Sequence, residues 1–290
     1  MTIKDAQNIR ERFFYEENLS DEDFFLYSEA MAFLIDQTKN PRYMIELGGA
    51  YYELRNFDLA LKYYEMAASL GDEEANICLG YIWYYGRTGT VDYKKAFECY
   101  SKAPSHINAL YKAADMYRNG YYVEKNYEKY KEIIEDIYAT RLKFEPHYIP
   151  EICTRLARIR SNEGKTDEAI RLYRKAREEL TARICHDAFF GNINIMKWLI
   201  DDLYKLTDID MKNLDLFDLF ELLKKPVKIR FQCDADEREH FVEAVEEDGI
   251  VVVNFDGNWY RSVDDLFRKG EIVGERLVKL AYELRDFEAE

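Results

Sequence analysis

The sequence predicts a mainly α-helical protein, in which a stack of helix pairs is followed by a small α+β domain. Three observations indicate this fold class. In the first two thirds, apolar residues recur at helical spacing, and one pattern of small and aromatic residues returns after 32 and then 34 residues. Near residue 225 the spacing changes to the alternation of a half-buried strand. The 290 residues include only 13 Gly and 5 Pro, which excludes long disordered tracts.

Two short patterns define the repeat. The first is a Leu-Gly or Ala-Ala pair followed three positions later by an aromatic residue, and it occurs at Leu47-Gly48-x-x-Tyr51, Leu79-Gly80-x-x-Trp83 and Ala113-Ala114-x-x-Tyr117. The second is Ala-x-x-x-Tyr-x-x-Ala, and it occurs at residues 60–67, 96–103 and 169–176. Small residues let two helices approach closely, and the aromatic residue fills the space beside them. Each copy is therefore predicted to be a helix–turn–helix unit that buries its apolar face by stacking on its neighbours.

These copies resemble the Sel1-like branch of the tetratricopeptide superfamily. The stretch from Gly86 to Ala96 reads Gly-Arg-Thr-Gly-Thr-Val-Asp-Tyr-Lys-Lys-Ala, close to the Sel1 connection in which Gly-x-x-Val-x-x-Asp-x-x-Lys-Ala joins the two helices. The shorter turns near residues 55–58 and 164–167 look more like ordinary tetratricopeptide units. The resemblance covers roughly residues 42–180. It implies a right-handed α–α solenoid, a fold that many adaptor proteins share.

The pattern divides the chain into four segments. Residues 1–41 are expected to form an N-terminal helical cap, because Ser20 begins an apolar helix that Asn40-Pro41 ends. Residues 42–205 form the solenoid, and residues 206–225 a helical linker. Residues 226–290 form the small α+β domain, in which Val227 to Cys233 alternate as a half-buried strand, and Phe241, Glu243 and Val245 begin a second strand-like run.

Composition and charge limit the classes of partner and compartment. The net charge of −15 and the pI near 4.9 disfavour binding to nucleic acid or to anionic membranes. No apolar run approaches the roughly 20 residues of a membrane helix, and the N-terminus lacks an apolar signal sequence. Five scattered cysteines argue against a disulfide framework. We therefore expect a cytoplasmic protein with no nucleic-acid or membrane partner.

Motifs that carry catalysis are absent from the sequence. It contains no phosphate-binding loop, dinucleotide fingerprint, nucleophile elbow or zinc-protease motif. None of its four histidines lies three or four residues from another, and Cys-x-x-Cys does not occur. Cys185, His186 and Asp187 are neighbours, but neighbours on a helix point in different directions. We therefore expect no catalytic residue, no metal site and no cofactor, and we interpret the chain as non-enzymatic.

The resemblance also suggests where a partner would bind. In tetratricopeptide relatives the first helix of each unit lines the concave face. Carried over by position, this rule selects ten partner-binding side chains: Tyr52, Tyr81, Tyr84, Tyr85, Tyr111, Arg118, Asn119, Arg155, Arg158 and Asn162. Tyr and Arg commonly anchor interfaces, and Arg can hold a carboxylate with two hydrogen bonds. The expected partner is a protein or peptide with an aromatic or apolar part and an acidic end, bound by a scaffold or adaptor.

Other interpretations remain open at this point. The tyrosines can instead pack between repeats, and the arginines can form an ordinary charged helix surface. The C-terminal module can make the protein a regulatory or effector protein, which binds a small ligand or has an unrecognised activity. Residues 206–290 hold 12 basic against 22 acidic residues, whereas residues 141–185 hold 11 basic against 7 acidic. The acidic tail can therefore fold back onto the basic stretch.

Overall fold

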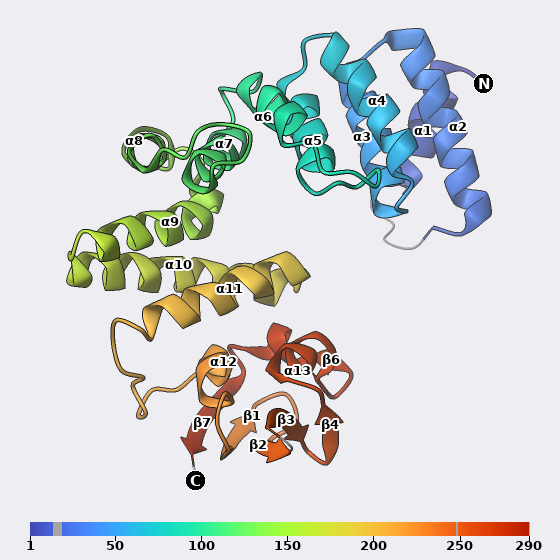
Figure 1. Cartoon of the computed structure of the whole chain (residues 1–290). Coiled ribbons are helices and arrows are strands. Elements are labelled where there is room, and N and C mark those ends of the chain that lie inside the picture. The colour runs from blue at the N-terminus through green and yellow to red at the C-terminus, as the bar shows by residue number, and fades with distance from the viewer. Residues whose placement is uncertain (14–18, 248, 290) are drawn as a thin grey trace. The chain divides into compact units, whose positions relative to one another are not determined.

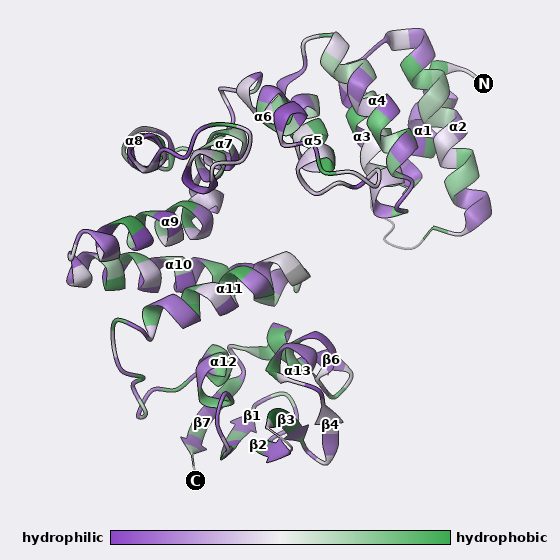
Figure 2. Ribbon diagram, viewed as in Figure 1, coloured by the Kyte–Doolittle hydropathy of each residue, from purple (hydrophilic) through white to green (hydrophobic). Residues whose placement is uncertain are grey.

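The structure is a computed structural model that describes residues 1–13, 19–247 and 249–289 (Figure 1). The chain divides into two compact units, residues 1–134 and residues 135–290. Hydrophilic and hydrophobic residues are interleaved along the helices (Figure 2), as expected when each helix buries one face. Among the described residues, no helix is both long enough and apolar enough to cross a bilayer.

The first unit is a stack of helices. They are α1 (Ile3–Phe13), α2 (Asp21–Thr38), α3 (Pro41–Glu53), α4 (Phe57–Ser69), α5 (Glu73–Tyr84), α6 (Tyr93–Ser101), α7 (Ile107–Asn119) and α8 (Tyr127–Asp136), the last of which reaches the boundary between the units. From α1 to α7, each helix packs against the next one along the chain. This arrangement is the predicted series of stacked helix pairs.

Side-chain caps explain where these helices begin. An oxygen of the residue before the helix accepts a backbone N–H of the first turn at the start of α2, α3, α4, α5 and α6, and the capping residues are Ser20, Asn40, Asn56, Asp72 and Asp92. Each cap satisfies one of the backbone donors that a helix start leaves unpaired. Gly120 ends α7 with φ of 75°, a left-handed conformation that glycine adopts without strain.

The small residues of the repeat pattern make room for tyrosine rings. A Cβ atom placed on Gly80 of α5 would lie 2.3 Å from the ring of Tyr100 on α6, which is 1% exposed. In the preceding pair, a Cβ atom on Gly48 of α3 would lie 2.7 Å from the ring of Tyr64 on α4. The predicted packing of a small residue against an aromatic ring is therefore confirmed in both pairs.

The second unit begins with helical elements. They are η1 (Ile137–Arg141), η2 (Pro146–Tyr148), α9 (Ile149–Asn162), α10 (Thr166–His186), α11 (Phe190–Leu203), η3 (Leu216–Asp218) and α12 (Leu219–Leu222). Helix α10 packs against both α9 and α11. Arg177 of α10 is held by Asp215 Oδ1 at 2.5 Å, Asp218 Oδ1 at 2.8 Å and the Tyr204 hydroxyl at 3.0 Å. Two carboxylates of the acidic tail therefore pair with an arginine of the basic stretch.

A five-stranded antiparallel sheet completes the second unit. Its strands lie in the order β4-β3-β2-β1-β7, and their bounds are β1 (Val227–Cys233), β2 (Arg238–Glu247), β3 (Ile250–Phe255), β4 (Asn258–Tyr260) and β7 (Leu284–Ala289). Between β4 and β7 lie α13 (Val263–Lys269), the short hairpin of β5 (Glu271–Ile272) and β6 (Glu275–Arg276), and η4 (Leu277–Leu280). The predicted α+β domain is present. The register between β1 and β7 shifts between Arg230 and Gln232.

Strand β2 buries every second side chain. The buried ones are His240, Val242 and Ala244, so Phe241, Glu243 and Val245, with which the predicted strand-like run begins, belong to the other face. Strand β2 lies between β1 and β3. Its core face is set by partners such as Phe255, which lies opposite Val242, while Phe241 points to the other side.

The sheet domain packs on the helices of its own unit. The guanidinium group of Arg276 donates a 2.8 Å hydrogen bond to the backbone oxygen of Ala188, beyond the end of α10. Lys197 of α11 forms an ion pair of 2.5 Å with Asp264 of α13. The predicted domain boundaries at residues 205 and 225 therefore lie inside a compact unit that extends from residue 135.

Candidate functional site

Tyrosines and cations alternate along one surface of the first unit. The Tyr52 hydroxyl of α3 accepts a 2.9 Å hydrogen bond from Arg87 Nε, in the loop after α5. The Arg87 guanidinium carbon lies 5.4 Å from the ring centre of Tyr85, and Lys112 Nζ of α7 donates a 2.9 Å hydrogen bond to the Tyr85 hydroxyl. We call this set, completed by Tyr81 and Tyr84, the aromatic–cation strip.

Lys112 organises the α5 end of the strip. Its Nζ atom lies 5.1 to 5.3 Å from the ring centres of Tyr81, Tyr84 and Tyr85. The rings of Tyr81 and Tyr85 are nearly parallel, with centres 6.1 Å apart. A cation over a tyrosine ring contributes about 0.5–1 kcal/mol at an exposed site. The rings are therefore held in place before any partner arrives, although Tyr85 remains 46% exposed.

The phenol of Tyr84 stays neutral in this setting. Burial raises its pKa well above the usual value, and the nearby carboxylate of Asp115 adds to the rise. The ring also contacts Tyr121, whose own ring stacks on that of Tyr93 with centres 4.3 Å apart. The cluster of aromatic residues thus extends from the strip to α6 and to the segment after α7.

One cation of the strip, Arg87, was missed by the concave-face rule, because it lies in the loop between α5 and α6. Lys112 lies on the first helix of the next repeat, which that rule does select. The rule also selects four tyrosines of the strip, which the structure brings together: Tyr52, Tyr81, Tyr84 and Tyr85. The position of Arg87, directly after the loop glycine Gly86, was the one signal in the sequence that could have indicated it.

The remaining predicted residues of the first unit have other surroundings. Tyr111 is only 7% exposed, because its ring packs inside the stack, and we leave it out of the candidate surface. The Arg118 guanidinium carbon lies 5.5 Å from the ring centre of Tyr130, and its Nε atom donates a 3.4 Å hydrogen bond to Asn119. Arg118 is thus half-buried against its own repeat, while Asn119 is exposed.

The predicted residues of the second unit lie on α9. Arg155 donates a 2.8 Å hydrogen bond to the backbone oxygen of Glu151, one turn earlier. Arg158 Nε forms an ion pair of 2.5 Å with Asp202 of α11. Asn162 is exposed at the last residue of α9. An acidic partner at Arg158 would therefore compete with a carboxylate of the chain itself.

The repeat pattern identifies the family. The family model described as Sel1 repeat matches residues 43–72, 74–103, 107–129 and 163–179. The chain contains four Sel1-like repeats over these residues. The first three matches cover helices α3 to α7 and the start of α8, and the fourth covers much of α10. The Sel1 repeat fold is generally a protein–protein interaction scaffold, and Sel1 repeat proteins are typically non-enzymatic.

Solved structures share the Sel1 fold. A Sel1 repeat protein from Oxalobacter formigenes is 20% identical and superposes with a TM-score of 0.53, over 77% of this chain and 83% of that one. The protein c5321, a protective antigen present in uropathogenic Escherichia coli strains that displays an SLR fold, is also 20% identical. It superposes with a TM-score of 0.49 over 71% of this chain and 42% of its own. No curated protein matches the sequence.

Outside the Sel1 matches, a shallow open cavity lies between α11 and α13. Its volume is about 380 Å³, and its lining is Asn194, Lys197, Trp198, Arg261, Ser262, Asp264, Asp265 and Arg268. Trp198 is 55% exposed there. Lys197 is paired with Asp264, whereas Arg261 and Arg268 add positive charge to the wall. The cavity therefore combines an aromatic surface with cations that suit an anionic ligand.

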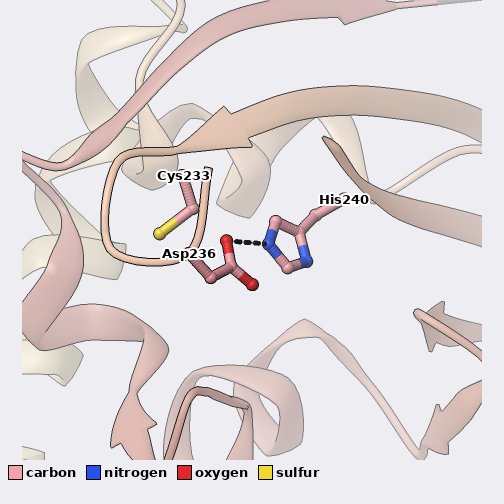
Figure 3. A group of neighbouring side chains, drawn as sticks. All are labelled: Cys233, Asp236 and His240. Atoms are coloured by element: carbon pink, nitrogen blue, oxygen red, sulfur yellow. Dashed lines mark hydrogen bonds and ion pairs between the residues drawn. The ribbon is translucent and has the colours of Figure 1, made fainter. Parts of the chain in front are cut away.

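A second feature outside the Sel1 repeats lies at the β1–β2 turn (Figure 3). Cys233, Asp236 and His240 each direct a potential metal-ligand atom into a group whose atoms lie within 4.8 Å of one another. Burial raises the pKa of the Cys233 thiol, and hydrogen bonds from the backbone N–H groups of Ala235 and Asp236 oppose this rise. Burial also lowers the pKa of His240, but its hydrogen bonds to Asp256 and Asp236 outweigh burial and raise the pKa above the usual value.

Proposed function

We propose that this Sel1 repeat protein is a non-enzymatic scaffold that binds a protein or peptide through the first-helix face of its repeats. The observation that carries the proposal is the aromatic–cation strip. Its members come from α3, α5 and α7, which begin successive repeats, together with one loop side chain. A surface that continues across repeats fits an extended or helical segment better than a small molecule.

The chemistry of the strip indicates the kind of partner. Tyrosine rings cover a large area with few torsion angles, so little side-chain entropy is lost on binding. Contacts with Arg87 and Lys112 order the rings further in the free protein. These two cations can also form ion pairs with carboxylates of the partner, to which they donate hydrogen bonds. We therefore propose a partner segment with aromatic or apolar side chains beside acidic ones.

The other predicted residues stay within the proposal as secondary contacts. Arg118 and Asn119 end the first helix of the third repeat. Arg155, Arg158 and Asn162 occupy the helix that precedes the fourth Sel1 match. We propose that Arg155 and Arg158 meet the acidic end of a partner, with Asp202 as the competitor that such a partner must displace.

The double variant Tyr85→Ala/Lys112→Ala tests the strip. The partner is first captured with the full chain by cross-linking and identified by mass spectrometry. We expect the double variant to raise the Kd for that partner by about 30-fold or more, because interface anchors each contribute about 2 kcal/mol. The matched control Tyr138→Ala/Lys175→Ala removes an exposed tyrosine and an exposed lysine elsewhere. If both variants bind the partner as the unmodified chain does, the strip is not its binding surface.

A second candidate function rests on the cavity between α11 and α13. Its lining by Trp198, Arg261 and Arg268 favours a regulatory or effector protein that binds a small anionic ligand with a planar group. A panel of phosphorylated and carboxylated metabolites, screened against the full chain by thermal shift, tests this candidate. We expect any ligand that raises Tm to lose its effect in Arg261→Ala/Arg268→Ala. A ligand effect unchanged in that variant would place its site elsewhere.

A further inference from the structure

The β1–β2 hairpin brings together three side chains that are separate in the sequence. Cys233 is the last residue of β1, Asp236 lies in the turn, and His240 is the third residue of β2. Cys233 is fully buried and His240 is 6% exposed. Figure 3 shows the thiol, the carboxylate and the imidazole gathered beside the turn. No contact of the aromatic–cation strip involves them, so they are independent of the proposed scaffold surface.

The donor atoms and their spacing suit a transition-metal ion. A thiolate, an imidazole nitrogen and a carboxylate oxygen are the three kinds of ligand that Zn²⁺ uses in proteins. In a tetrahedral site such atoms lie roughly 3.3 to 3.6 Å from one another, given the usual zinc–ligand distances. Here His240 Nε2 lies 3.1 Å from Asp236 Oδ1, and the full set lies within 4.8 Å. The widest separation exceeds the tetrahedral value by up to about 1 Å, so the side chains would have to draw together to hold one ion.

The surroundings of His240 orient its ring for this role. Its Nδ1 atom lies 2.5 Å from Asp256 Oδ2, just after β3, and Asp256 Oδ1 accepts a 2.8 Å hydrogen bond from the backbone N–H of Phe241. With Nδ1 held by Asp256, a metal ion would take the place of the proton that Nε2 shares with Asp236, as in carboxylate–histidine–zinc arrangements.

We propose that Cys233, Asp236 and His240 bind one divalent transition-metal ion, and that Zn²⁺ fits this donor set best. The protein supplies three ligands, so the fourth position is open to water or to an external ligand. Asp256 acts as the positioning residue for the imidazole. Through His240 and Asp256, the ion would link the β1–β2 turn to the residue that follows β3, at one end of these strands. The sequence pattern alone led us to expect no metal site.

Titration of the full chain with metal ions tests this site. After removal of bound metal with a chelator, Co²⁺ should bind one ion per chain and give a thiolate-to-cobalt charge-transfer band. Zn²⁺ should displace Co²⁺ and raise Tm of the second unit. Cys233→Ser and His240→Gln should lose the band and weaken Zn²⁺ binding at least 100-fold. Asp256→Asn should weaken it about 10- to 100-fold with the band retained.

The control is Cys185→Ser, which removes a thiol elsewhere in the same unit and should leave binding unchanged. Asp236→Asn changes a turn side chain outside the core. If Cys233→Ser fails to fold, the Zn²⁺ affinity of Asp236→Asn tests the site in its place. Any of three results would overturn the proposal. The first is that Co²⁺ gives no charge-transfer band, and the second is that Cys233→Ser leaves the Zn²⁺ affinity unchanged. The third is that Asp236→Asn and Asp256→Asn both fold and both bind Zn²⁺ as the unmodified chain does.

Discussion

Replacing Arg177 with methionine should destabilise the second unit by about 3–5 kcal/mol, because it leaves the buried carboxylate of Asp218 and the half-buried one of Asp215 without their cation. The Arg177 side chain is 15% exposed, that of Asp218 is 3% exposed and that of Asp215 is 46% exposed. The two carboxylates would keep hydrogen bonds from the Tyr204 hydroxyl and from backbone N–H groups of their own turn, but these neutral donors do not replace the cation. Urea unfolding of the full chain, followed by hydrogen exchange and mass spectrometry, measures the stability of each unit separately.

The cost of Arg177→Met should depend on pH. Burial raises the pKa of Asp215 above its ordinary value, and Arg177 is the group that opposes this rise. Without Arg177, the pKa of Asp215 in the folded state lies further above its value in the unfolded state. The folded variant then holds more protons, so its stability falls as pH rises. We expect a larger loss at about pH 7 than at about pH 4.5.

The control for this prediction lies on the same helix. Arg171→Met removes an exposed arginine of α10 and should change the free energy of unfolding by less than about 0.5 kcal/mol. A similar small loss for Arg177→Met, or a loss that does not depend on pH, would show that the buried carboxylates find other partners.

Adding a single methyl group at Gly80 should destabilise the first unit by about 1–3 kcal/mol. A Cβ atom there would lie 2.3 Å from the ring of Tyr100, which is fully buried and cannot move aside without disturbing α6. Gly49→Ala is the matched control, because its Cβ atom meets only the Tyr64 hydroxyl at 3.8 Å. In a helix that substitution should stabilise by about 0.5–1 kcal/mol.

Thermal unfolding of both glycine variants gives the comparison. A loss of Tm for Gly80→Ala together with an equal or higher Tm for Gly49→Ala would show that close packing, and not helix propensity, keeps glycine at position 80. Equal gains in both variants would contradict the prediction, since they would mean that Tyr100 shifts at little cost.

The repeat packing could be predicted from the sequence because each contact joins residues at a fixed spacing. Gly80 and Tyr100 belong to patterns that recur along the chain, and stacking follows from them. The place of Arg87 in the strip could not be predicted in this way, because it lies in a loop outside the repeat spacing. Arg87 and Lys112 contact the same tyrosine ring from a loop and from the next repeat, so this contact depends on how the repeats stack.

The cluster at the β1–β2 turn was missed for a different reason. The search for metal ligands considered pairs of histidines and Cys-x-x-Cys, and His240 has no such neighbour in the sequence. The hairpin instead joins three different ligand types from β1, the turn and β2. Because side chains alternate with a period of two and β1 pairs with β2, Cys233 and His240 share one buried face.

The ends of the β-sheet also bear on how this protein meets others. Strand β4 has three residues, and β7 is broken by a register shift and carries Arg285, Asp286 and Glu288. Short, bulged and charged outer strands resist the addition of a strand from another chain. Unwanted sheet growth between copies is thereby discouraged, and the same features disfavour a partner that would bind by adding a strand to this sheet.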